Sequence, residues 1–125
     1  MSEAGLGGYQ EPFFMDEAQR RQLQEQRINQ TAETLAQQFM QGNEEDYPSV
    51  SKDQAFLVYK FLNTSQEMLV AGMTQLQPAQ LTQFFRKLAK QLHPDKNGHP
   101  QAKDAFQAVQ AAMESAQAAS KHASF

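Results

Sequence analysis

The sequence contains neither cysteine nor tryptophan, and it has no long hydrophobic run. Without cysteine, the chain has no disulfide, no thiolate metal site and no cysteine nucleophile. No segment approaches the roughly 18 consecutive apolar residues that indicate a transmembrane helix. The histidines also lack metal-ligand spacing and a matching set of carboxylates; they are His93, His99 and His122. We therefore expect no metal and no other cofactor.

The first residues lack the features of a targeting leader. Residues 1–10 have no basic segment followed by an apolar one, and the acidic pair Asp16-Glu17 follows soon afterwards. Both observations argue against a secretory or mitochondrial leader. We expect a soluble intracellular protein in the cytoplasm.

Charge is distributed unevenly along the 125 residues. Residues 1–50 hold nine acidic and three basic side chains, a balance of -6, whereas residues 51–125 hold five acidic and eight basic ones, a balance of +3. Such a division indicates either two segments with different partners or a mild attraction between the two segments. We expect an N-terminal arm and amphipathic helix over 1–50, a buried connecting helix over 51–63, a helical domain over 64–120 and a tail over 121–125.

The N-terminal segment carries apolar side chains that have no obvious core to join. Residues 1–15 are expected to form an irregular, glycine-containing arm, whose apolar side chains either dock onto the folded body or bind another protein. Residues 16–40 have the composition of a helix with a thin apolar stripe. Such a stripe suits a helix that lies across a surface, either its own or that of a partner. The candidate partner-binding residues are Tyr9, Phe13, Phe14, Leu23, Ile28, Leu35 and Phe39.

The next helix is expected over residues 52–62. Ser51 and Gln54 have the spacing of a capping box at its start. Residues 55–62 are apolar nearly all round, so a helix here would be deeply buried. A strand is the alternative, since four of these residues are aromatic or β-branched, but no neighbouring segment offers a partner strand.

A helical hairpin is predicted in the C-terminal half. A short helix should start with Thr64 and Glu67 at capping-box spacing and end at Gly72. Longer helices are expected at about 78–92 and 100–119, separated by a polar turn that begins with a proline. The core face of the first long helix comprises Leu81, Phe84, Phe85, Leu88 and Leu92. The predicted fold is therefore all-α.

The turn and its flanking helices carry a recognisable motif. The helix over 78–92 contains Phe85-Arg86-Lys87-Leu88-Ala89, and it is followed by His93-Pro94-Asp95-Lys96-Asn97. The next helix places Phe106, Val109 and Ala112 three residues apart. This arrangement resembles the J-domain (DnaJ-like) family, over roughly residues 65–118. A lone His-Pro-Asp tripeptide is a weak signal, but its position between two helices of the correct phase is specific.

The resemblance implies a co-chaperone that binds a DnaK-type (heat-shock protein 70) chaperone and stimulates its ATPase. The residues that it assigns to chaperone binding are His93, Pro94, Asp95, Arg86, Lys87, Lys90, Phe85, Lys96 and Asn97. The N-terminal half would recruit a client or a protein complex. The chain departs from the family pattern at Phe84, where alanine is common, and at Gln77, where a serine or threonine usually caps the helix.

Other functions fit parts of the pattern. The protein could be a small structural subunit of a larger assembly, in which the J-like domain serves as an interaction module. It could also contact nucleic acid through the basic helix, although a pI near 5.5 argues against this. His93 and Asp95 cannot serve a serine-type triad, because adjacent residues on one tight turn do not reach that geometry. We do not expect an enzyme.

Overall fold

The computed structural model describes residues 15–123, and over this range the chain forms five helices and no strand. The all-α prediction is confirmed, and residues 55–62 are helical. No helix among the described residues has both the length and the apolar character needed to cross a membrane. The helices are α2 (Glu17–Gly42), α3 (Lys52–Leu62), α4 (Gln66–Thr74), α5 (Pro78–Leu92) and α6 (Ala102–Ala123).

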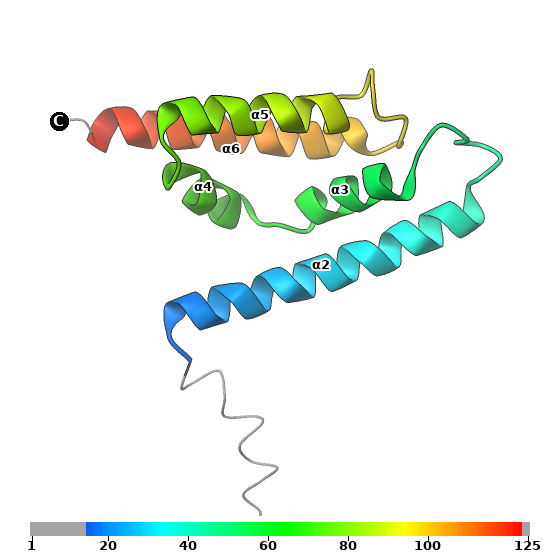
Figure 1. Cartoon of the computed structure of the whole chain (residues 1–125), viewed down its shortest axis with the longest axis horizontal. Helices are drawn as coiled ribbons and strands as arrows, with labels where there is room; N and C mark the ends of the chain where they lie inside the picture. The colour runs from blue at the N-terminus through cyan, green and yellow to red at the C-terminus, as the bar shows by residue number, and fades with distance from the viewer. Residues whose placement is uncertain (1–14, 124–125) are drawn as a thin grey trace, which may run out of the picture.

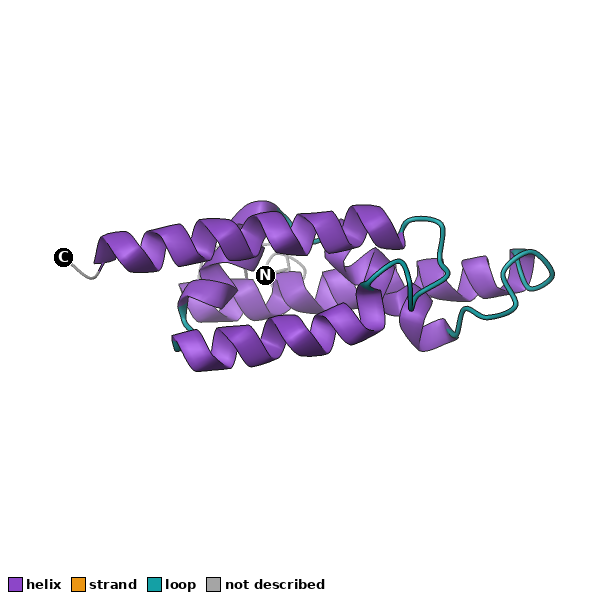
Figure 2. Ribbon diagram, turned by 90° about the horizontal axis from the view of Figure 1, so that it is seen from above, coloured by secondary structure: helices purple, strands orange, loops and turns teal. Residues whose placement is uncertain are grey.

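The helices are stacked in three levels, as Figure 1 shows. Helices α5 and α6 form an antiparallel hairpin, and the view from above in Figure 2 shows them running side by side. Helices α3 and α4 pack beneath this hairpin, mainly against α6. Helix α2 packs against α3 on the side that faces away from the hairpin. Helix α3 therefore has neighbours on two sides, which explains its apolar surface.

Local capping accounts for where the helices begin. The Ser51 hydroxyl accepts a bond from the Gln54 N–H (3.1 Å), and the Gln54 side chain accepts one from the Ser51 N–H (3.0 Å). This is the predicted capping box of α3. At α5 the Gln77 N–H donates to the Gln80 side chain (2.9 Å), so the N-terminal residue Gln77 still has a partner despite the missing serine or threonine.

Helix α4 differs from the prediction at both ends. Its N-cap is Ser65, whose hydroxyl accepts a bond from the Met68 N–H (3.2 Å), whereas the predicted cap, Thr64, donates back to the Lys60 carbonyl (2.7 Å). The predicted end at Gly72 is also wrong, because the helix continues to Thr74. Gly72 does not adopt a positive φ, so it does not form the left-handed turn that ends many helices.

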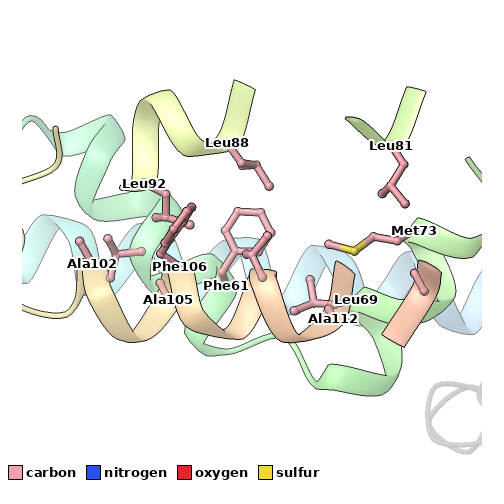
Figure 3. Packing of buried hydrophobic residues seen from close by; sticks show 13 residues of the cluster. Phe61, Leu69, Met73, Leu81, Leu88, Leu92, Ala102, Ala105, Phe106 and Ala112 are labelled. Atoms are coloured by element: carbon pink, nitrogen blue, oxygen red, sulfur yellow. The ribbon is translucent and has the colours of Figure 1, made fainter. Parts of the chain in front are cut away.

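Two hydrophobic clusters hold the helices together. The larger one lies between α3, α4, α5 and α6, and Figure 3 shows Leu92 of α5 beside Phe106 of α6. Small alanines on α6 allow this close packing; those buried in the cluster are Ala102, Ala105, Ala112 and Ala116. The smaller cluster joins α2 to α3 and contains Ala36, Phe39, Val50 and Ala55.

The apolar stripe of α2 is covered unequally. Phe39 is buried against α3, whereas Leu23, Ile28 and Leu35 are half-buried. The N-terminal half of α2 borders a groove of about 690 Å³ whose other wall includes α4. Apolar side chains in the lining of this groove include Ile28, Leu69, Met73 and Phe84. The other candidate residues, Tyr9, Phe13 and Phe14, lie outside the described residues.

Candidate functional site

The His-Pro-Asp motif occupies a tight loop at the end of the α5–α6 hairpin (Figure 1). Helix α5 ends with the His93 N–H donating to the Ala89 carbonyl (3.0 Å). His93 then turns to extended dihedrals, φ -59° and ψ 136°, as expected for a residue that precedes proline. Its carbonyl accepts bonds from the N–H groups of Lys96 (2.8 Å) and Asn97 (2.9 Å). These two bonds close the turn.

His93 and Asp95 are linked within the loop. The Asp95 N–H donates to His93 Nδ1 (3.1 Å), and the Asp95 carboxylate lies 3.8 Å from the same nitrogen. Because Nδ1 accepts a bond, it carries no proton in this arrangement, and the neutral ring holds its proton on Nε2. The 3.8 Å contact is then not an ion pair. The Asp95 side chain is 87% exposed, so its carboxylate is open to an external donor.

An aromatic contact fixes the His93 ring against α6. The rings of His93 and Phe106 meet edge to face, with centroids 5.0 Å apart, and Phe85 packs on the same phenylalanine at 5.7 Å. Phe85 is half-buried. Phe85 therefore packs on the ring that holds His93, and part of its side chain remains exposed.

A group of exposed cations lies on α5 and in the loop. Arg86, Lys87 and Lys90 are exposed on α5, and Lys96 is exposed within the loop. None of the four makes a salt bridge within the part of the chain that the structure describes. No acidic residue occurs between positions 68 and 94. The exposed face of α5 therefore presents uncompensated positive charge beside the Asp95 carboxylate.

Asn97 lies on the inner side of the loop. Its side chain is 1% exposed, and its amide nitrogen donates to the carbonyls of Gln91 (2.9 Å) and Gln54 (3.3 Å). Its amide oxygen accepts a bond from the His99 N–H (2.9 Å). The family resemblance predicts that Asn97 contacts a chaperone. With its polar atoms bonded inside the chain, Asn97 is instead in a position to hold the loop.

His99 is buried, which its position in a polar turn of the sequence does not predict. Its ring is 4% exposed and stacks on Phe39 with centroids 4.2 Å apart. Tyr59 approaches the same ring edge-on at 4.9 Å, and the Gln101 N–H donates to His99 Nδ1 (3.0 Å). Burial lowers the pKa of His99 to about 4. The ring is therefore neutral at neutral pH, and its buried Nε2 has no hydrogen-bond partner among the described residues.

The site has no donor set for a metal ion. Among the residues that the structure describes, no three histidine, cysteine or acidic side chains come together. The arrangement offers an exposed carboxylate, a group of cations and a hydrogen-bonded turn. These features suit recognition of another macromolecule.

Comparison with known proteins assigns the family. The DnaJ domain family matches residues 57–125, which is more than half of the chain and includes the second half of α3, the loop and the α5–α6 hairpin. Comparisons with curated proteins and with solved structures give no match. The motif, its helical setting and the family match agree, and the chain belongs to the DnaJ domain family.

Proposed function

We propose that the protein is a co-chaperone that binds a DnaK-type chaperone through His93-Pro94-Asp95 and stimulates its ATPase. The observation that carries this proposal is the exposed Asp95 carboxylate, held on a closed turn that follows a helix with exposed cations. The family membership supports it, since the matched region contains the complete motif.

The rigidity of the loop favours binding. Pro94 fixes one backbone dihedral, and the His93 carbonyl closes the turn by accepting two N–H groups. A segment that is already ordered loses little conformational entropy when it binds a partner. The Asp95 carboxylate can accept a charge-assisted bond, which an arginine of the partner would supply in bidentate form.

The exposed face of α5 would supply a second contact. Arg86, Lys87 and Lys90 face solvent on one helix, and Lys96 extends the positive charge into the loop. Such a surface attracts an acidic patch and speeds the encounter with it. The chaperone would therefore be guided by the α5 face and recognised by the loop.

Single-turnover ATP hydrolysis by a DnaK-type chaperone tests the proposal. Asp95→Asn keeps the size of the side chain but removes its charge, and we expect stimulation to fall at least about tenfold, because a charge-assisted bond is lost. His93→Gln should also weaken stimulation. Glu114→Gln removes an exposed carboxylate elsewhere, on α6, and should leave stimulation unchanged. Absence of stimulation by the unmutated protein would refute the proposal.

The N-terminal half would recruit a client or a protein complex. The support for this is the groove between α2 and α4, whose apolar lining includes Ile28 and Met73. Apolar surfaces bordered by polar residues are typical of interaction sites. Stable incorporation into a complex, with the His-Pro-Asp loop buried there, would instead support a structural subunit.

A further inference from the structure

The inner side of the His-Pro-Asp loop is bonded to a part of the chain that precedes the family match. The Gln54 amide nitrogen donates to the Lys96 carbonyl (3.1 Å), and the Asn97 amide nitrogen donates to the Gln54 carbonyl (3.3 Å). The first turn of α3 is thus joined to two consecutive loop residues by bonds in both directions. Gln54 lies before residue 57, where the match begins.

The connection between α2 and α3 also approaches the loop closely. A Cβ atom added at Gly98 would lie 3.0 Å from the Ser49 hydroxyl and 3.4 Å from a methyl group of Val50. The 3.0 Å spacing is tighter than most Cβ contacts, so the Ser49 side chain would have to shift by a few tenths of an ångström, whereas the 3.4 Å spacing is close to an ordinary van der Waals contact. Val50 is itself buried in the cluster between α2 and α3. Loop and connection lie at the same end of the molecule (Figure 1).

Helix α2 supplies the third contact. Phe39, in its last turns, stacks on His99 at 4.2 Å, and Tyr59 of α3 closes the other side of the ring. Residues 96–99 therefore touch the end of α2, the connection that follows it and the start of α3. The inner side of the loop is therefore supported by these three parts of the chain together.

We propose that the segment from Phe39 to Gln54 is a positioning element for the His-Pro-Asp loop. This inference rests on the proposed function, because it assigns the segment a role in chaperone binding without direct contact. The N–H groups of Lys96 and Asn97 both bond to the His93 carbonyl, so whatever holds these two residues also restrains His93 and Asp95. The segment thereby keeps the motif in one conformation before the chaperone arrives.

The kinetic consequence is specific. Without the segment's contacts, the loop samples more conformations, and only the fraction in the competent one can bind. The concentration of this protein that gives half-maximal stimulation then rises. The maximal rate of ATP hydrolysis stays unchanged, because the bound loop reaches the same arrangement. General damage to the fold would lower both the maximal rate and the thermal stability.

Gln54→Glu isolates the hydrogen bond to the loop. Glutamate keeps an oxygen that accepts the Ser51 N–H and so preserves the cap of α3, but it lacks the amide donor that reaches the Lys96 carbonyl. Gln80→Glu is the matched control, because the Gln80 side chain accepts the Gln77 N–H in the same way at the start of α5, at the far end of the hairpin from the loop. Both variants are made in the full chain.

Phe39→Ala isolates the contact from α2. It removes the ring that stacks on His99. Leu69→Ala is its matched control, because Leu69 is equally buried at 8% exposure but lies on α4, away from the loop. The readouts are amide hydrogen exchange at Lys96 and Asn97, and chaperone ATPase stimulation as a function of protein concentration, below the melting temperature of each variant.

We expect Gln54→Glu and Phe39→Ala to raise amide exchange at Lys96 and Asn97 about tenfold, since local opening is then easier. We expect the half-maximal concentration to rise about fivefold at an unchanged maximal rate. Gln80→Glu and Leu69→Ala should change neither. Equal exchange and equal half-maximal concentrations in variants and controls would overturn the inference. If the unmutated protein stimulates no chaperone, the proposed function fails, and hydrogen exchange alone decides whether the segment holds the loop.

Discussion

At the scale of single residues, His99 is the group whose surroundings most disfavour charge. Its ring contacts those of Phe39 and Tyr59, and its Nε2 has no hydrogen-bond partner within residues 15–123. Burial removes the water that would stabilise an imidazolium, which is why the pKa of His99 falls to about 4. In the unfolded chain the pKa of a histidine is about 6.5. The folded and unfolded states therefore bind protons differently in mildly acidic solution.

This difference predicts that the stability of the fold falls as the pH is lowered. Above about pH 6.5 both states are neutral at His99, and the residue adds no pH dependence. Between about pH 6.5 and pH 4 the unfolded state takes up a proton that the folded state rejects, so the free energy of unfolding falls, by up to about 3 kcal/mol. His99→Phe keeps a ring between Phe39 and Tyr59 but cannot titrate.

Urea unfolding at pH 7.5 and pH 4.5 checks the prediction. The loss of stability between these pH values should be larger in the unmutated protein than in His99→Phe. The comparison of the two proteins cancels the contribution of the other titrating groups. An equal loss in both would show that the charge of His99 is accommodated in the folded state.

At the scale of helices, the sequence predicted the hairpin well and the packing of α2 poorly. The spacing of Leu81, Leu88 and Leu92, with a proline directly after the helix, defines the core face and the end of α5. In contrast, α2 is attached largely through Ala32 and Ala36, both fully buried. Alanine is a good helix former at any position, so its burial leaves no clear pattern in the sequence.

The contacts on the inner side of the loop could not be predicted from the sequence for a related reason. Asn97 and Gln54 lie 43 positions apart, and each is a polar residue with a local explanation, the first in a turn and the second in a capping box. His99 sits in a polar turn, where a histidine is usually solvated. Only the fold brings these residues together. The exposed His-Pro-Asp residues could thus be predicted from a local motif, whereas the contacts on the inner side of the loop depend on long-range packing.

The exposed charge of α5 predicts a strong dependence of chaperone binding on salt. Arg86, Lys87 and Lys90 are free of salt bridges within the described chain, so a partner's acidic patch would meet them unscreened at low ionic strength. Raising the salt concentration from 50 to 300 mM, chosen here to shorten the screening length about 2.5-fold, should increase the half-maximal concentration for ATPase stimulation.

Replacing the three cations by alanine tests the source of this effect. The variant should stimulate weakly at low salt and should show a much flatter salt dependence, because fewer charges remain to be screened. Lys103→Ala, an exposed cation on α6, serves as the control and should retain the original dependence. A salt dependence that persists in the triple variant would place the electrostatic contact elsewhere.

At the scale of the whole molecule, the proposed surfaces are separated by the central level of helices. The exposed face of α5 and the N-terminal half of α2 lie on opposite sides of α3 and α4 (Figure 1). A chaperone at the loop and a recruited protein in the groove between α2 and α4 would therefore not compete for space. The C-terminal end of α2, at Phe39, is the point where the two parts meet.

This separation predicts that the two activities can be lost independently. Ile28→Asp places a charge in the apolar lining of the groove, which should weaken association with the recruited protein, because the carboxylate would be desolvated without a partner. It should leave ATPase stimulation unchanged, since Ile28 lies about 11 residues, or roughly 16 Å of helix, from Phe39. Asp95→Asn should have the opposite pattern. Quantitative co-purification of tagged full-length variants from the source cells, paired with the ATPase assay, measures both activities. If Ile28→Asp recovers the same proteins in the same amounts as the unmutated chain, recruitment does not use this groove, and the half-exposed stripe of α2 has only a structural role.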